Sequence, residues 1–524
     1  MRLTARFSRS KGNPGGVARG MSVVAPIGGW DAISPLSEMP PQNAVALVNW
    51  FPQPGWVEVR RGYVSQCDTG TAAPVESLMA YTGATVASPR LFAASDGSIY
   101  DVTNATPVQA VTGLSNDRWQ HTNFANAAGS FLWACNGQDV PRYYNGTAWQ
   151  TATITGVTPQ DMIHVTVYRN RIWTVLKSST KAAYLPLDSI QGAAATFEVG
   201  PQFTLGGELI AIGTWSTDTI DGPNEYIAFI SSRGEIAIYM INDPTQASGI
   251  NYLGTARIGP PVGRRCTAKF GSDLILICID GLLPLSKVLS YDRAALLQVS
   301  ISKNIQPVVT QSARNQKTVF GWQLISYPRS TMAILNVPII EGTQQEQFVQ
   351  NTITGAWCRF TAQNANCWEV FEDRAYFGGN DGIVYLADEA GVDATGILEA
   401  DMRGAFNYYG TRGRQKRWTM IRPLITTDGA VDPSIAVNVD FQDNAPLSQA
   451  GSFFPGSAIW DVALWDVASW SGQLTVSDDW KSISGIGYCA SIRMFVEIST
   501  GAPIEPVTLQ INSFDVQVED GAYI

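Results

Sequence analysis

Few residues of this chain have the types and spacing that catalysis or metal binding requires. The two histidines, His121 and His164, are too far apart for an HExxH helix or a local zinc site. Neither a GxxxxGK[ST] phosphate loop nor a GxSxG nucleophile elbow occurs in the sequence. We therefore expect no catalytic residue, no metal site and no cofactor, and a protein that is not an enzyme.

The cysteines and one acidic segment are the other candidates for chemistry. The 7 cysteines are odd in number and show no CxxC spacing, which predicts reduced and mostly buried thiols. Asp218, Asp221, Asn224 and Glu225 offer oxygen ligands for calcium but lack the spacing of a helix-loop-helix site. We expect this segment to be a solvated loop.

Basic residues gather in one part of the chain, where they alternate with aromatic residues. This basic cluster consists of Arg403, Arg412, Arg414, Lys416, Arg417 and Arg422, with Phe406, Tyr408, Tyr409 and Trp418 between them. Such a mixture suits nucleic acid, because guanidinium groups meet phosphates and rings stack on bases. It equally suits an acidic face of a neighbouring subunit, which the overall negative charge favours. A solvated loop is the third alternative.

A second cluster repeats tryptophan every five residues, at Trp460, Trp465 and Trp470. In an extended segment this spacing places alternate tryptophans on opposite faces. One face would pack inward while the other meets a partner, since tryptophan is enriched at interface hot spots. The alternative is that all three rings belong to the core.

Composition and charge limit the classes of function. The chain of 524 residues carries a formal net charge of −10, so its overall charge does not favour tight DNA wrapping. Its first twenty residues hold five basic residues and no acidic one, without the apolar stretch of a secretion signal. We expect a basic flexible arm that is solvated or binds a partner, with Met21 as a second candidate start. No apolar run is long enough to span a bilayer, so stable membrane insertion is not expected.

The remaining elements are predicted to be short β-strands joined by tight turns. Between about residues 76 and 390 a polar turn repeatedly precedes an alternating run that ends in an aromatic residue, as at Asp96-Gly97, Arg169-Asn170 and Glu372-Asp373. Hairpins repeating without long helices favour an all-β fold, a β-propeller of six or seven blades. A pair of β-sandwiches is the alternative.

The sequence divides into four regions on this interpretation. Residues 1–24 form the basic arm, 25–75 the N-terminal part of a β platform domain, 76–390 the propeller, and 391–524 the C-terminal β domain that completes the platform. The platform is therefore expected to be built from both ends of the chain.

One set of positions near the N-terminus carries a resemblance to a known family. These positions are residues 25–30, Pro35, Leu36, 39–41, 43–45, Leu47, 49–52, 57–60, Gly62 and Tyr63. They resemble the opening of the tail nozzle proteins of short-tailed bacteriophages, a family also called tail tubular protein B or packaged-DNA stabilization protein. Residues 376–385 and the tryptophan repeat at 460–470 are similar to the family as well. None of these motifs is catalytic.

The resemblance implies a structural virion protein of the viral tail. Six copies would form a homohexamer, the tail nozzle, below the tail adaptor and the portal. The ring would continue the DNA channel, retain the packaged genome and pass it during DNA ejection without sequence-specific binding. Tail fibres or tailspikes are further candidate partners, and assembly would take place in the host cytoplasm.

The resemblance also places the platform against the adaptor and neighbouring subunits. The expected interface residues are Trp30, Trp50, Phe51, Arg403, Arg412, Arg414, Lys416, Arg417, Arg422, Trp460, Trp465 and Trp470. Two alternatives come from other classes of protein. One is a carbohydrate-binding or sialidase-like propeller that contacts host surface glycans, and the other is a propeller that acts as an interaction hub without forming a ring.

Overall fold

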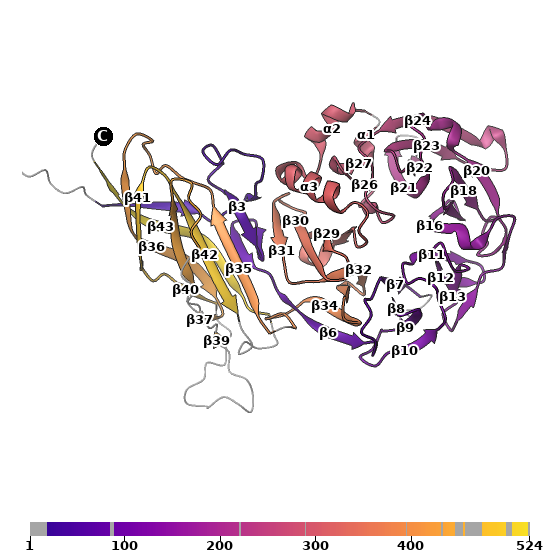
Figure 1. Ribbon diagram of the computed structural model, residues 1–524, viewed down its shortest axis with the longest axis horizontal. Coiled ribbons are helices and arrows are strands. Elements are labelled where there is room, and N and C mark those ends of the chain that lie inside the picture. The colour runs from indigo at the N-terminus through magenta and orange to yellow at the C-terminus, as the bar shows by residue number, and fades with distance from the viewer. Residues whose placement is uncertain are drawn as a thin grey trace, which may run out of the picture.

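A computed structural model of the chain describes residues 18–83, 89–219, 222–288, 290–394, 396–430, 433–445, 454–455, 474–498 and 506–521. The described residues are mostly β-strand. They form a ring of sheets and a flat two-sheet platform beside it (Figure 1).

The ring is a β-propeller. Six of its sheets stand alone, and the seventh position is taken by four strands of a nine-stranded sheet. The first strands of these sheets, β7, β11, β16, β21, β25, β28 and β32, contact one another in that order, and β32 contacts β7. The expected propeller fold is therefore confirmed.

The strands of the ring have the following bounds. The first two sheets contain β7 (Ser77–Tyr81), β8 (Arg90–Ser95), β9 (Ser98–Asp101) and β10 (Val108–Val111), then β11 (Gln120–Asn126), β12 (Gly129–Cys135), β13 (Arg142–Tyr144) and β14 (Trp149–Thr151). The next two contain β16 (Met162–Tyr168), β17 (Arg171–Leu176), β18 (Lys181–Tyr184) and β20 (Ala195–Glu198), then β21 (Leu209–Thr219), β22 (Gly222–Ser231), β23 (Glu235–Ile241) and β24 (Ile250–Arg257). The last three positions contain β25 (Thr267–Phe270), β26 (Asp273–Cys278) and β27 (Gly281–Pro284), then β28 (Gln323–Tyr327), β29 (Met332–Ile340), β30 (Gln344–Asn351) and β31 (Trp357–Phe360), and finally β32 (Ala365–Phe371), β33 (Arg374–Gly379), β34 (Ile383–Ala390) and β6 (Gly62–Asp68).

The turns of the ring explain why the hairpins were visible in the sequence. Asp96 and Gly97 join β8 to β9 with φ angles of 50° and 66°. Arg169 and Asn170 join β16 to β17 with φ angles of 46° and 55°. Two-residue hairpin turns need positive φ, which Asn, Asp and Gly adopt at least cost.

Strand β6 closes the ring from the N-terminal side. It pairs with β34, so that the last sheet combines strands from both ends of the propeller segment. The propeller therefore begins at residue 62, and the expected boundary at residue 76 was wrong. The sequence concealed this because β6 is separated from its partner strand by the whole propeller.

The platform consists of one seven-stranded sheet and the other part of the nine-stranded sheet. The seven-stranded sheet, called sheet A here, contains β1 (Arg19–Val24), β4 (Trp50–Gln53), β5 (Trp56–Val59), β36 (Lys416–Thr427), β40 (Thr475–Ser477), β41 (Lys481–Gly487) and β43 (Leu509–Asp520). The nine-stranded sheet adds β2 (Gly29–Trp30), β3 (Asn43–Val48), β35 (Leu398–Gly404), β42 (Ala490–Ile498) and β38 (Ser434–Val439) to β28–β31. Both chain ends contribute strands, as expected.

The arm was expected to extend to residue 24, and its last residues are instead part of the fold. Strand β1 pairs antiparallel with β43 from Arg19↔Val518 to Val24↔Ser513. Met21 and Val23 pack against the main apolar core. A run of alternating apolar residues as short as this one gave too weak a signal beside the basic residues that precede it.

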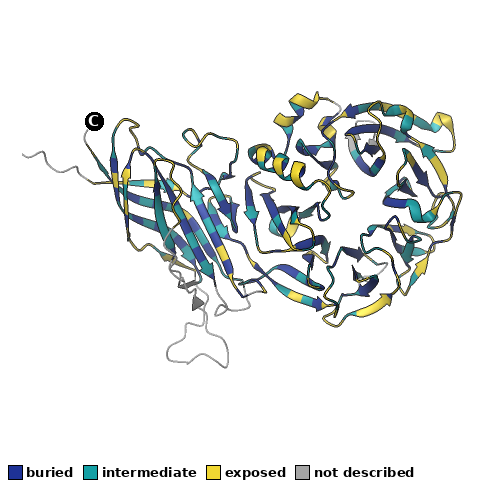
Figure 2. Cartoon of the chain, in the orientation of Figure 1, coloured by how far each residue is buried: buried dark blue, intermediate teal, exposed yellow. Residues whose placement is uncertain are grey.

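One apolar core joins the platform to the neighbouring sheets of the ring. It includes Trp50 and Trp418 of sheet A, Trp357 of the nine-stranded sheet and Leu276 of β26. Figure 2 shows the buried residues running through the strands of both parts. All seven cysteines are free and buried, which confirms the prediction for the thiols.

The two chain connections between platform and propeller meet at a buried ion pair. Arg60, between β5 and β6, donates from Nη1 and Nη2 to the Asp393 carboxylate, which follows β34, at 2.8 and 2.7 Å. The side chains of Arg60 and Asp393 are 1% and 0% exposed. The remaining donors of Arg60 bond to Asn49 Oδ1 and to the carbonyl oxygens of Arg61 and Thr361. The guanidinium is therefore fully hydrogen-bonded, as a buried charge requires.

Helices replace the fourth strand of the sheet β25–β27. They are α1 (Leu285–Val288), α2 (Arg293–Val299) and α3 (Gln306–Gln316), with the 3₁₀ turn η4 (Lys303–Ile305) between α2 and α3. Figure 1 shows them on the side of the ring that lies next to the platform. These are the α-helices of the described part of the chain, none of which is long and apolar enough to cross a membrane.

Candidate functional site

The exposed surface of sheet A brings basic and apolar side chains together. Paired residues of neighbouring strands point to the same face of a sheet, and Arg417 of β36 pairs with Ile486 of β41. Thr426, further along β36, pairs with Val476 of β40. Arg417, Val476, Trp480 and Ile486 are exposed on this face, and Arg422 is partly exposed there. We call these five residues the outer platform surface.

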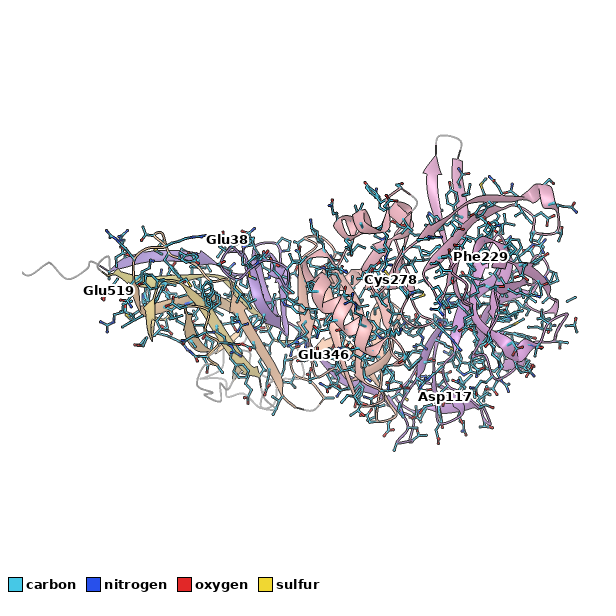
Figure 3. The ribbon with its side chains drawn as sticks, turned by 45° about the horizontal axis from the view of Figure 1, so that its top comes forward. Glu38, Asp117, Phe229, Cys278, Glu346 and Glu519 are labelled. Carbon is cyan, nitrogen blue, oxygen red and sulfur yellow. The ribbon has the colours of Figure 1, made fainter. Side chains whose placement is uncertain are left out.

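The arginines of the outer platform surface already have partners within the chain. The Arg422 guanidinium donates to Asp515 at 2.6 Å and lies over the Trp480 ring at 5.2 Å from its centre. Arg417 is 4.0 Å from Glu519, whose position at the far end of the platform is labelled in Figure 3. Arginine and tryptophan beside exposed aliphatic residues resemble the composition of a protein–protein interface.

The structure separates the other members of the basic cluster. Arg412 is exposed and forms a two-point ion pair with Glu38, at 2.8 and 3.1 Å. Arg403 forms an ion pair with Asp443. Arg414 lies in the loop before β36, where it makes contacts within the chain.

Lys416 is buried, which the sequence did not indicate. Its ammonium group donates to the carbonyl oxygens of Thr411, Arg414 and Tyr488, and burial lowers its pKa. Lys416 therefore holds the loop 411–414 against the end of β41. We expected an interface residue here, and the structure assigns a supporting role within the chain.

The aromatic residues expected at the interface are part of the chain's own core. Trp50 and Phe51 are 0% and 1% exposed, and Trp30, at 9%, packs edge-on against Phe348. These three rings are therefore packed within the chain itself. Trp460, Trp465 and Trp470 lie outside the described residues.

A polar cavity of about 450 Å³ lies along the axis of the ring. Its walls come from six of the innermost strands or the residues next to them, and include both histidines of the chain, Arg265 and Lys269. Sequence reasoning missed this site because the strands that form it are far apart in the chain.

Burial controls the charges around the cavity. It lowers the pKa of His121 and of His164 to about 4, and raises the pKa of Glu369, whose Oε2 is 3.4 Å from His121 Nε2, to about 8. These shifts favour the uncharged forms of both histidines and of Glu369. His164 Nδ1 accepts the Ile212 amide at 3.5 Å, so the imidazole proton is on Nε2.

Arg265 fixes the wall of the cavity between three strands. Its Nη2 donates to Ser77 Oγ at 2.7 Å and to the carbonyl oxygens of Glu76 and Trp119. The described residues contain no group of three His, Cys, Asp or Glu side chains that could hold a metal ion.

Comparison with known proteins gives structural similarity only. No family model matches the chain, and no curated protein matches it. Among solved structures, BBS1N in complex with ARL6DN covers 63% of this chain and 98% of its own at 10% identity and a TM-score of 0.38. YCF48 bound to D1 peptide covers 67% and 99% at 11% identity and a TM-score of 0.37. BamB from Moraxella catarrhalis covers 65% and 93% at 11% identity and a TM-score of 0.36.

Proposed function

We propose that this chain is a structural protein of a short-tailed phage tail, and that six copies form a nozzle continuing the DNA channel. The observation that carries the proposal is the position of the residues that resemble the nozzle family. Residues 43–48 form β3 of the nine-stranded sheet, residues 50–59 form β4 and β5 of sheet A, and Gly62 begins the closing strand β6. The matching segment thus makes the joint between platform and propeller.

The outer platform surface supports assembly through the platform. This face exposes Trp480 beside two arginines, with Val476 and Ile486 next to them, and tryptophan and arginine are the residue types enriched at interface hot spots. The acidic partners of the arginines, Asp515 and Glu519, lie at the same surface and would allow ion pairs to exchange between subunits.

The test is the mass of the particle that the purified chain forms. Light scattering and negative-stain imaging should show a six-fold ring with a central hole, formed alone or on the adaptor–portal complex. A chain that stays monomeric with and without that complex would contradict the proposal, and glycan binding by the monomer would then support the alternative propeller function.

A double variant tests the surface itself. Arg417→Glu with Ile486→Glu should prevent ring formation and leave the monomer folded, because both side chains are exposed. The matched control is Arg374→Glu with Val108→Glu, which changes the same types of exposed residue on the propeller. Rings formed normally by the first variant would exclude the outer platform surface as the interface.

A further inference from the structure

The helical insertion α1–α3 is basic in a chain that is otherwise acidic. Residues 285–320 contain five basic residues and one acidic residue, Asp292, whereas the whole chain has a net charge of −10. The elements of the insertion contact one another in order, α1 with α2, α2 with η4 and η4 with α3. The insertion is therefore one contiguous unit of the fold, and it carries all five basic residues.

Most of these charges have no acidic partner in the structure. Lys287, Lys303, Arg314 and Lys317 are exposed, and none of them forms an ion pair with a carboxylate of the described residues. Arg293 differs, because it donates to both oxygens of Asp280 at 2.7 and 2.9 Å. Four cations that the fold does not neutralise are thus available to an external anion.

The outward face of α3 and of the residues after it is polar. Val309 and Ala313 face the core, while Gln311, Arg314, Asn315 and Thr318 are exposed. These exposed residues are three or four positions apart, so they form one stripe along the helix. Figure 2 shows the exposed faces of the helices at the edge of the ring.

The chemistry of this stripe differs from that of the outer platform surface. It presents guanidinium, amide and hydroxyl donors, and no carboxylate interrupts it. Such donors are among those that bond to the phosphate oxygens of nucleic acids. The exposed apolar residues of the insertion, Tyr291 and Leu297, precede or belong to α2 and are absent from the α3 stripe.

We infer that the helical insertion binds the phosphate backbone of double-stranded DNA without sequence specificity. The choice of DNA among polyanions rests on the proposed function. The exposed cations of the insertion are a feature of the structure and do not depend on that function. Four phosphate contacts give a binding constant that falls with the salt concentration with a logarithmic slope of about −3.6. The acidic remainder of the chain keeps the binding weak, which suits a surface along which DNA moves.

The experiment measures DNA binding by the isolated chain, whether or not it forms a ring. A fluorescein-labelled 30-base-pair duplex of arbitrary sequence is titrated with the protein in KCl from 50 to 150 mM, and anisotropy is recorded. Affinity should fall about fiftyfold over this threefold range of salt. The variant Lys287→Gln, Lys303→Gln, Arg314→Gln and Lys317→Gln should lose most of the binding at 50 mM and nearly all of the salt dependence.

The matched control removes four exposed cations of other sheets, with Lys181→Gln, Arg233→Gln, Arg257→Gln and Arg374→Gln. It should bind DNA like the parent chain. Equal loss in both variants, or no binding by the parent chain at 50 mM, would overturn the inference. Should the fourfold variant lose its circular dichroism spectrum, the single changes Arg314→Gln and Lys317→Gln replace it, and each should reduce the slope by about 0.9.

A separate outcome identifies an acidic protein surface as the true partner. In that case the parent chain does not bind DNA, and the fourfold variant loses a self-association that light scattering detects in the parent. Because particle mass and DNA anisotropy are measured independently, failure of this inference is distinguishable from failure of the proposed nozzle.

Discussion

Replacement of Asp393 should lower the free energy of unfolding more than replacement of a carboxylate in an exposed ion pair. In Asp393→Ala the guanidinium of Arg60 keeps its bonds to Asn49 and to two carbonyl oxygens but loses both bonds to the carboxylate. It then remains a buried cation without a counter-charge. Breaking a buried pair in this way costs about 3–5 kcal/mol.

The chain contains a matched pair with the same chemistry at the surface. Arg412 and Glu38 also form a two-point ion pair between distant parts of the sequence, but both side chains are 60% exposed. Exposed pairs contribute about 0–1 kcal/mol because water solvates both charges. Glu38→Ala is therefore the control, since it removes a carboxylate that also accepts two bonds from one arginine, but at an exposed site.

The assay is urea unfolding followed by circular dichroism and by tryptophan fluorescence. Two probes are needed because a chain of two parts can unfold in more than one step. Asp393→Ala should shift the midpoint of the least stable transition well below that of Glu38→Ala. The double variant Arg60→Met with Asp393→Leu should recover much of the loss, since it leaves no unpaired charge. Equal midpoints for Asp393→Ala and Glu38→Ala would refute the reasoning.

Two further predictions concern the chain end and the axial cavity. Truncation before Pro26 should lower the free energy of unfolding, measured by urea denaturation, by about 2 kcal/mol. The reason is that Met21 and Val23 leave the core and β43 loses the strand β1 at its edge. An unchanged free energy of unfolding would show that β1 contributes nothing to stability. Burial raises the pKa of Glu369 to about 8, above its ordinary 4.5. Between these two pH values the folded chain holds a proton that the unfolded chain has released. The free energy of unfolding therefore falls as the pH rises to 8. Between pH 6.5 and 8.5 the Tm of the parent chain should therefore fall relative to that of Glu369→Gln, and parallel Tm curves would contradict the assignment.

The propeller could be predicted because its signals are local. A turn such as Arg169-Asn170 and the alternation of the strands beside it lie within a few residues of each other, and the structure contains that hairpin. The closing strand β6 could not be assigned in the same way, because its partner β34 is more than three hundred residues later. Pairing between distant strands leaves no local pattern in one sequence.

The candidate interface was harder to predict, because residue type does not reveal which face of a strand meets solvent. The residue types of Trp50 and Lys416 suggest an interface, yet both side chains are buried within the chain. Arg417 has a residue type that suggests the same and is exposed, since it alternates with the buried Lys416 and Trp418 along β36. Ile486 gave no signal, because only its pairing with Arg417 places it on the outer platform surface.

The pairing of Gly62 with Ala390 places the two ends of the propeller side by side, so the propeller is an insertion within the platform. This arrangement determines the order in which the parts can form during synthesis. Strand β3 pairs with β35, which a ribosome reaches tens of seconds later at ordinary elongation rates. The propeller can close as soon as β34 emerges, whereas β3 has to wait for β35, and β1 and β5 have to wait for β43. The completed ring thus keeps the N-terminal platform strands beside the end of β34 until the C-terminal platform strands have been synthesised.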